Sequence, residues 1–394
     1  MKQKPELLSP AGSFPSLIAA IESGADAVYF GLQEFNMRAR AKNFKISDLP
    51  RIKKLTFQKK IKKYLTLNAI IYNNELKPLE KLIKKAKPFV DAIICSDIAV
   101  MILCKKYKIP FHVSTQCSVS NKETAKFYKK FGAERIVLAR ELNLKQIKEI
   151  SKIINTEIFI HGAMCISVSG RCLTSQFLFN ESANRGKCLQ PCRRKYNVED
   201  SEGNRLRLEN NYILSPKDLC TLPFIEKLKK ANIKAFKIEG RNREPEYVHT
   251  VTKVYRQALD RKLTKKQITE LTKELEKVYN KGFSGGFYNK LPTSDDFSKI
   301  EHSSATHTKS FIGKLVHYYP KIKVGLLHIS SGKIKQGDEI YITGKTTGLV
   351  KHKISEMQIN HKEVRQAKKG QDVGIKMPFA RKGDDVYRII NKIN

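Results

Sequence analysis

The chain has 394 residues, enough for two or three domains with their own cores, so it does not need disulfides to fold. Its opening residues lack the apolar segment of a secretory signal, and no apolar run approaches the roughly 18–20 residues that cross a bilayer. We therefore expect a cytoplasmic protein with reduced thiols and no membrane partner. The formal net charge of +37 favours a polyanionic partner such as a nucleic acid, although a lysine-rich composition alone produces the same excess.

Short apolar runs alternate with amphipathic stretches over the first 240 residues. The runs are too uniformly apolar for strands with one wet face, as expected of parallel strands buried on both sides. Segments with helical periodicity, such as 13–24, 75–88 and 143–155, lie between them. Eight repeats predict an α/β fold of the (β/α)8 barrel type, with a doubly wound open sheet as the alternative. The predicted strands cover 5–12, 26–32, 64–71, 91–97, 110–116, 135–141, 156–164 and 235–241.

Polar side chains occur in or just after these apolar runs. Burying them costs free energy unless they face a polar site, so we expect several to form a pocket at one mouth of the barrel. Rim ion pairs are the alternative reading. An Arg-rich pocket suits a carboxylate or polyanionic ligand, because a guanidinium binds such groups in bidentate fashion. The candidates are Glu6, Ser9, Asn36, Arg38, Arg40, Asn68, Asp97, Ser114, Gln116, Arg140, Glu141, His161, Lys237, Glu239 and Arg241.

A cysteine-rich insertion, at about 162–220, separates the seventh and eighth predicted strands. It leaves the carboxyl end of a strand, where such barrels build their active sites. Its four cysteines are separated by gaps of six, fifteen and three residues, which form no C-x2-C zinc knuckle. These gaps favour an iron–sulfur cluster, while structural zinc and ligand-free thiols stay open. The predicted ligands are Cys165, Cys172, Cys188 and Cys192. Cys220 is a spare candidate, for which we favour an apolar helix position instead.

The C-terminal third has a different texture. Residues 244–281 predict two helices, the first closing the barrel, and 282–310 are rich in Gly, Ser, Thr and Asp, as in a linker. From 311 to 394, alternating segments separated by turn signals predict a small antiparallel β-barrel. The phrase GKIKQGDEIYITG and the later GQDVGIKM resemble the second domain of translation factors such as elongation factor Tu. The expected domains are therefore 1–281 and 311–394, joined by 282–310.

Most hydrolase and nucleotide-binding motifs are missing from the sequence. There is no H-E-x-x-H, Walker A or G-x-G-x-x-G pattern, and the G-x-S-x-G match GFSGG at 282–286 falls in the stretch that we interpret as a linker, not between a strand and a helix. The one Cys–His proximity is His161 near Cys165, and this spacing says little about a thiol-protease dyad.

Long motifs around the cysteines resemble one known family. The stretches EIFIHGAMCISVSGRCLTS, ANRGKCLQPCRRKY, LSPKDLC and FKIEGRNREPEYV, with the early ELLSPAG and NMRARAKNF, are similar to the collagenase-like peptidase family, the unassigned peptidase family thirty-two. The similarity spans nearly the whole chain and is greatest to the tRNA hydroxylation protein P branch. A sister branch hydroxylates a cytidine in ribosomal RNA.

The resemblance implies an iron–sulfur RNA-modifying hydroxylase rather than a protease. It implies a 4Fe–4S cluster on Cys165, Cys172, Cys188 and Cys192, and prephenate as the hydroxyl source for 5-hydroxyuridine at the tRNA wobble position. The motif residues Arg38, Glu239 and Arg241 would line the site, with His161 a further catalytic candidate. A collagenase-like peptidase, an rRNA hydroxylase and a non-catalytic RNA-binding subunit that only holds a cluster are the alternatives. A tRNA partner fits the charge, since an unpaired anticodon base enters a pocket without duplex melting.

Overall fold

A closed parallel barrel forms the first part of the computed structural model, which describes residues 4–197, 199–205 and 214–392. The eight strands pair in sequence order, and β9 closes the ring by pairing in parallel with both β1 and β7. The predicted (β/α)8 fold is confirmed, and the open-sheet alternative is wrong. The strands are β1 (Glu6–Pro10), β2 (Ala27–Gly31), β3 (Lys62–Leu67), β4 (Ala92–Cys95), β5 (Phe111–Val113), β6 (Arg135–Val137), β7 (Asn155–Gly162) and β9 (Ala235–Ile238).

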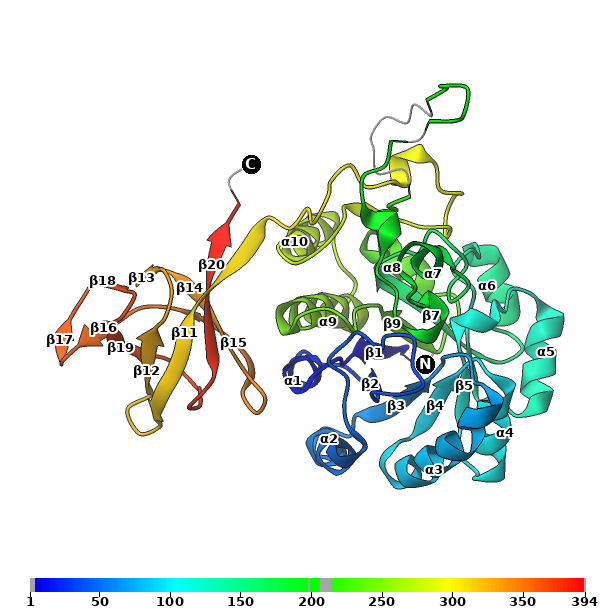
Figure 1. Cartoon of the computed structure of the whole chain (residues 1–394), viewed down its shortest axis with the longest axis horizontal. Coiled ribbons are helices and arrows are strands. Elements are labelled where there is room, and N and C mark those ends of the chain that lie inside the picture. The colour runs from blue at the N-terminus through cyan, green and yellow to red at the C-terminus, as the bar shows by residue number, and fades with distance from the viewer. Residues whose placement is uncertain (1–3, 198, 206–213, 393–394) are drawn as a thin grey trace.

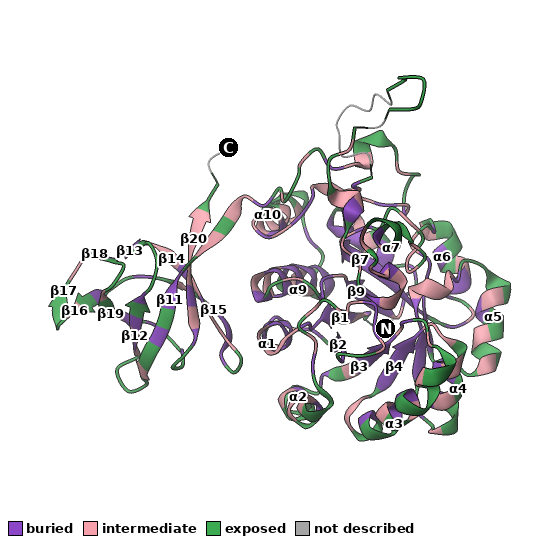
Figure 2. Ribbon diagram, in the orientation of Figure 1, coloured by how far each residue is buried: buried purple, intermediate pink, exposed green. Residues whose placement is uncertain are grey.

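Helices surround the barrel, and most of them bury one face against it. Most residues of the barrel strands are buried, whereas the outer faces of the helices are exposed (Figure 2). Within the described residues, no helix is long and apolar enough to span a bilayer. The helices are α1 (Phe14–Glu22), α2 (Leu49–Phe57), α3 (Leu76–Ala86), α4 (Ile98–Lys106), α5 (Lys122–Phe131), α6 (Leu144–Ile150), α7 (Thr174–Phe179), α8 (Ile225–Lys229), α9 (Pro245–Asp260) and α10 (Lys265–Glu276).

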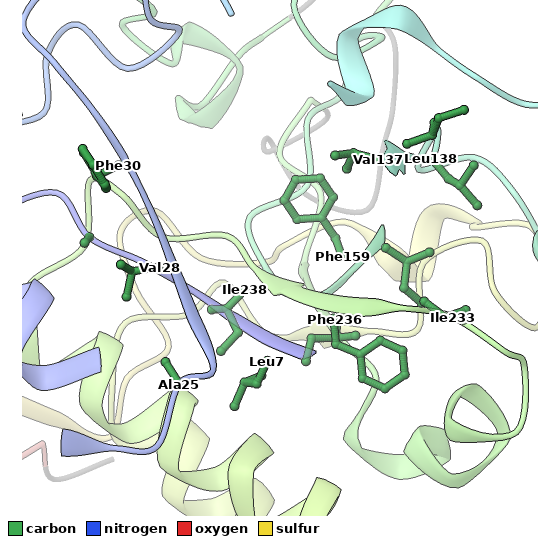
Figure 3. Packing of buried hydrophobic residues seen from close by; sticks show 14 of the residues in the cluster. Leu7, Ala25, Val28, Phe30, Val137, Leu138, Phe159, Ile233, Phe236 and Ile238 are labelled. Atoms are coloured by element: carbon green, nitrogen blue, oxygen red, sulfur yellow. The ribbon is translucent and has the colours of Figure 1, made fainter. Parts of the chain in front are cut away.

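The main hydrophobic core lies between the barrel and these helices. It contains side chains from every barrel strand, and Figure 3 shows part of it, with Leu7 of β1 close to Phe236 and Ile238 of β9. Each of these three side chains is fully buried. Burial of a large aliphatic or aromatic side chain contributes about 1.5–3 kcal/mol, so this layer holds the strand ends and their loops in place.

Two short strands modify the simple barrel. The strand β8 (Asp218–Cys220) runs antiparallel to β7, with Cys220 opposite His161, and β10 (Phe283–Ser284) pairs with β8. The helix position favoured for Cys220 is therefore wrong, because a three-residue segment is too short for its periodicity to distinguish a strand from a helix. The segment 282–310 also packs on the barrel, where the Tyr288 hydroxyl donates to the Phe159 carbonyl at 2.5 Å.

The C-terminal region consists of antiparallel sheets, as predicted, with its own core from Ile312 to Val386. Eight strands pair in the order β15-β14-β20-β11-β12-β19-β16-β17, and β13 pairs with β18. This region lies beside α1 and α9, which face β15 (Figure 1). The strands are β11 (His307–Tyr319), β12 (Val324–Ile329), β13 (Lys333–Lys335), β14 (Glu339–Gly344), β15 (Gly348–Lys353), β16 (Met357–Ile359), β17 (Lys362–Glu363), β18 (Gln366–Lys368), β19 (Asp372–Lys376) and β20 (Asp385–Asn391).

Candidate active site

Three arginines and one glutamate meet where the barrel strands end. Arg38 follows β2, Arg140 follows β6, and Glu239 and Arg241 follow β9. All four line a cavity of about 80 Å³ at the carboxyl ends of the strands, the end at which barrels of this type place their chemistry. We name this group the arginine mouth. The structure thus brings Arg38, Glu239 and Arg241 together, as the sequence motifs implied.

Hydrogen bonds hold the arginine mouth in a fixed geometry. Arg38 Nη2 donates to Glu239 Oε1 at 3.1 Å, and the Tyr29 hydroxyl donates to Glu239 Oε2 at 3.3 Å. The buried Arg241 guanidinium donates to Asn36 Oδ1 at 2.7 Å and to the Thr66 hydroxyl. Since each planar group is fixed from two sides, the mouth is ordered before any ligand arrives.

The charges of the arginine mouth are unequal. Burial acts to raise the pKa of Glu239, but Arg38, Arg140 and Arg241 outweigh it, and the pKa lies below its ordinary value. Burial, followed by repulsion from Arg38, lowers the pKa of Arg241 to about 10. In the described part of the chain, Glu239 is the one carboxylate that lines this cavity. The cavity therefore carries surplus positive charge and suits an anionic ligand.

Arg140 supplies hydrogen-bond donors that the protein does not use. Its Nη1 donates to the Ala163 carbonyl at 2.8 Å, and its guanidinium lies over the Phe159 ring, 4.5 Å from the centroid. Its Nε and Nη2 atoms are buried and have no partner among the described residues. Buried donors without partners cost roughly 1–3 kcal/mol each, so they indicate a site that an acceptor fills.

A neutral polar wall completes the cavity. Asn68 Nδ2 donates to Gln116 Oε1 at 2.7 Å, and Gln116 Nε2 donates back to the Asn68 carbonyl at 2.7 Å. The Ser114 hydroxyl donates to the same Gln116 oxygen at 2.8 Å. These predicted site residues thus lie on the mouth side, where they add neutral polar groups beside the cations.

The cysteine-rich insertion packs directly onto the arginine mouth. The Ala39 amide donates to the Gly186 carbonyl at 3.1 Å. Gly186 has φ +91°, and a Cβ atom there would lie 2.3 Å from the Asn36 carbonyl oxygen, so only glycine fits this approach. Residues 164–169 border a second cavity of about 240 Å³, which shares Arg140, Thr115 and Ser169 with the first. The insertion therefore forms one wall of the site.

The four clustered cysteines share one neighbourhood. All are free, with Cys165 exposed and the other three partly buried. Burial, followed by the charges of Cys165, Cys188 and Cys172, raises the pKa of Cys192, while Arg193 opposes this rise. Burial acts to raise the pKa of Cys172, but hydrogen bonds with Thr174 and Ser167 outweigh it and lower that pKa. The sulfurs are therefore close enough to affect one another.

The cysteines fit an iron–sulfur cluster by number and chemistry, but they are not arranged as a finished ligand cage. In the described ranges, no group of three or more His, Cys, Asp or Glu side chains has metal-binding geometry. Four thiols on one loop are the donor set of a 4Fe–4S cluster. The cluster remains a prediction, and Cys220 lies apart from the four, buried in β8.

Several predicted site residues lie away from the arginine mouth, and two of them, Arg40 and Glu141, border neighbouring cavities instead. His161 is buried beside Tyr255, whose hydroxyl is 3.4 Å from its Nδ1, and burial lowers its pKa to about 3. Glu6 begins β1 rather than ending it, and Ser9 bonds Thr252 of α9 at 2.7 Å. Asp97 caps α4 by accepting from the Ala99 amide at 2.9 Å. The expectation that Glu6, Ser9 and Asp97 join the pocket is wrong, because an apolar run does not reveal which strand end or face a polar residue occupies.

A buried charge network at the opposite end of the barrel was not found from the sequence. Arg135 Nη1 donates to Glu6 Oε1 at 2.7 Å and to Glu157 Oε2 at 3.1 Å. Lys237 Nζ donates to Glu157 Oε1 at 3.0 Å, and the Tyr64 hydroxyl donates to Glu6 Oε2 at 2.9 Å. We name these five residues the floor network; one of them, the predicted site residue Lys237, also lines the 80 Å³ cavity of the mouth from below. A charged residue inside an apolar run, as in RIVLARE and TEIFIHGAM, was the available signal.

Known proteins resemble this chain over most of its length. An uncharacterized protease from Methanocaldococcus jannaschii is 44% identical, and a collagenase from Porphyromonas gingivalis is 40% identical; each match covers 97% of both chains. The tRNA hydroxylation protein P1 of Bacillus subtilis is 35% identical over 87% of this chain and 84% of that protein. A 23S rRNA 5-hydroxycytidine synthase from Escherichia coli is 40% identical, but the match covers 65% of this chain and 39% of that protein.

The model of peptidase family U32 matches residues 12–297, which include the whole barrel after β1, the arginine mouth and all four clustered cysteines. The family resemblance of the sequence motifs is therefore confirmed. The chain belongs to peptidase family U32.

Proposed function

We propose that this protein hydroxylates the wobble uridine of tRNA to 5-hydroxyuridine, with prephenate as hydroxyl donor and a 4Fe–4S cluster on Cys165, Cys172, Cys188 and Cys192. The observation that carries the proposal is the contact of a four-cysteine insertion with a cavity that has surplus cations and unused donors on Arg140. Relatives named for tRNA hydroxylation add support at the level of the family.

The arginine mouth has the chemistry to hold a dicarboxylate. Arg140 offers two buried donors with no partner in the described chain, and Arg38 is half-exposed at the rim. A carboxylate that reaches Arg140 gains charge-assisted hydrogen bonds in a low-dielectric site, where they are roughly twice as strong as neutral ones. Glu239 fixes Arg38 and keeps its own negative charge, so it repels a carboxylate from that side and restricts the ligand's orientation.

The cysteine insertion supplies the ligand set. A bound 4Fe–4S cluster supplies one-electron redox chemistry. The Thr174 hydroxyl lies 3.3 Å from Cys172 Sγ, and the Ser175 hydroxyl donates to Cys188 Sγ at 4.0 Å. Hydrogen bonds of this kind stabilise thiolates, the form that binds iron.

Peptidase activity is the second candidate, because two of the relatives are named as a protease and a collagenase. A thiol peptidase needs a base oriented toward its nucleophile. No histidine lines either cavity of the site in the described chain, and His161 faces Tyr247, Tyr255 and Phe283 instead. The geometry thus favours hydroxylation over peptide hydrolysis.

Two measurements test the proposed function. Anaerobically purified protein should show the broad visible absorption of an iron–sulfur cluster and contain iron; a colourless protein with tightly bound zinc would contradict the proposal. Mass analysis of tRNA and rRNA nucleosides from a deletion strain without paralogues should then show loss of 5-hydroxyuridine derivatives. Loss of 5-hydroxycytidine in rRNA instead would favour the rRNA alternative, and cleavage of a fluorogenic collagen peptide would favour the peptidase.

The variant Cys172→Ser should lose the cluster and the tRNA modification while the barrel stays folded. The matched control is Cys117→Ser, since Cys117 lies outside the insertion and its thiol donates to the Ser96 carbonyl at 3.4 Å, a bond that serine can keep. Iron content, circular dichroism and nucleoside analysis report the three properties separately. A cluster that survives Cys172→Ser would sink this ligand assignment.

A further inference from the structure

A large cleft lies between the barrel and the C-terminal sheets. It has a volume of about 940 Å³, and its walls are the residues that follow β1 and β2, the segment after β9, and the turns that precede β15 and β20. Figure 1 shows the two regions facing each other at this side of the molecule, with α1 and α2 opposite β15. The cationic residues that line the cleft are Arg40, Lys42, Lys45, Arg51, Arg241, Arg243, Lys314, Lys345 and Lys382.

The carboxylates of the cleft are already engaged by the protein. Asp384 accepts from the Thr347 hydroxyl at 2.6 Å, and Asp48 accepts from the Lys45 amide at 2.8 Å. Asp385 pairs with Lys314, and Glu244 lies 3.6 Å from Lys309. These four are the acidic side chains that line the cleft in the described chain, and the nine cations listed above outnumber them.

Several cleft cations have no acidic partner of their own. In the part of the chain that the structure describes, Arg40, Lys42, Lys345 and Lys382 form no ion pair, and all four are exposed. Two of them come from the barrel and two from the C-terminal region. A surplus of unpaired cations on two facing walls attracts a chain of negative charges rather than one small anion.

The two walls are held at a fixed separation. Arg51 Nη2 donates to the Lys345 carbonyl at 2.9 Å across the interface, and the Arg51 guanidinium lies 3.9 Å from the centroid of the Phe14 ring. Gly348, with φ +76°, packs so closely on α1 that a Cβ atom there would lie 2.4 Å from Ile18. Because both walls are fixed before binding, little ordering entropy is lost when a ligand enters.

The cleft adjoins the arginine mouth. Arg241 lines both the cleft and the 80 Å³ cavity, and its guanidinium is fixed by Asn36 at 2.7 Å. Arg40 in the cleft is two residues from Arg38 in the mouth. A ligand lying along the cleft therefore lies next to the mouth, with Arg241 between the two cavities.

We propose that this cleft binds the phosphate backbone of the single-stranded RNA segment next to the modified base, with cations from both regions gripping successive phosphates. The inference rests on the proposed function and deepens it by naming the RNA-binding surface. Backbone binding of this type reads charge and spacing rather than sequence, so the cleft would position the strand while the mouth selects the base.

The test is a charge reversal on the full chain. The triple variant Lys42→Glu, Lys345→Glu, Lys382→Glu changes both walls, and the control Lys77→Glu, Lys81→Glu, Lys85→Glu makes the same charge change on exposed positions of α3. Anisotropy with a labelled tRNA anticodon stem–loop, over a series of salt concentrations, measures affinity. We expect the cleft variant to bind about tenfold or more weakly, with a log–log salt slope shallower by about 2, while the control stays near wild type. A variant with Gln at the same three cleft positions, and thermal melts of every variant, separate lost RNA contacts from lost folding.

The outcomes distinguish the two proposals. If wild-type protein binds the stem–loop and the cleft variant binds as the control does, the cleft inference is overturned and the proposed function stands. If wild-type protein does not bind the RNA at all, the proposed function is overturned, and the cleft inference with it.

Discussion

The two ends of the barrel both contain buried or half-buried cations, yet they are built in opposite ways. In the floor network, Arg135, 2% exposed, and Lys237 are matched by Glu6 and Glu157, and each carboxylate also has a second partner. In the arginine mouth, three guanidiniums share Glu239, and Arg140 keeps two buried donors unused. The charges of the floor network are balanced within the chain, whereas those of the arginine mouth are balanced only when an anion is bound.

The difference separates folding from function within one set of strands. A saturated buried network fixes strand register at little net gain in stability, but removing one partner leaves an uncompensated buried charge. A site with unpaired buried cations destabilises the protein as long as no ligand is bound. Removing one of its cations therefore relieves repulsion between the charges but weakens ligand binding. Stability should therefore depend on the floor network, and ligand affinity on the arginine mouth.

The largest effect on stability should come from Glu157→Gln. This change leaves Arg135 and Lys237 buried without their shared carboxylate, which costs about 3–5 kcal/mol of unfolding free energy. Chemical denaturation measures the loss. The control Glu123→Gln removes an exposed ion pair with Lys126 and should cost less than about 1 kcal/mol. Equal losses in the two variants would refute the distinction between the floor and the surface.

The pH dependence of the unfolding free energy should also report the contribution of the Glu157 carboxylate. Burial acts to raise the pKa of Glu157, but Lys237 and Arg135 outweigh it and lower the pKa from 4.5 to about 2. A depressed carboxyl pKa contributes stability that is present above the unfolded value and lost as pH falls toward the folded value. We expect wild-type protein to lose about 3 kcal/mol from this group between pH 4.5 and 2.

The same acid titration of Glu157→Gln provides the check. This variant has no carboxyl group to protonate at that position, so its unfolding free energy should change less steeply with pH over the same interval. Parallel curves for variant and wild type would show that Glu157 does not carry this linkage.

A smaller effect, and one of a different kind, is expected for Arg140→Met. Methionine removes the unpartnered donors but also the Nη1 bond to the Ala163 carbonyl, and because these effects oppose each other, stability should change by less than about 1 kcal/mol. Prephenate affinity, measured by calorimetry, should fall about 10–100-fold, the loss of one or two charge-assisted hydrogen bonds. The control is Arg261→Met, on an exposed residue after α9. Unchanged affinity for prephenate would remove Arg140 from the proposed ligand site.

Much of the fold was predictable from the sequence, because strands buried on both faces leave uniformly apolar runs. The short pairings β8–β7 and β10–β8 were not, since two- or three-residue strands carry no periodicity. The mouth residues Arg38, Glu239 and Arg241 were found through motifs. Residues such as Glu6 were placed at the wrong end, because composition along a run gives no direction. Arg135 and Glu157 were overlooked, since their partners lie far apart in the sequence.

The antiparallel pairing of β8 with β7 joins the two ends of the cysteine insertion at its base, where Gly162 and Leu219 lie opposite each other. This pairing is antiparallel and lies outside the ring of parallel pairs that closes the barrel. Opening it would release the base of the insertion without breaking any pairing between the eight barrel strands.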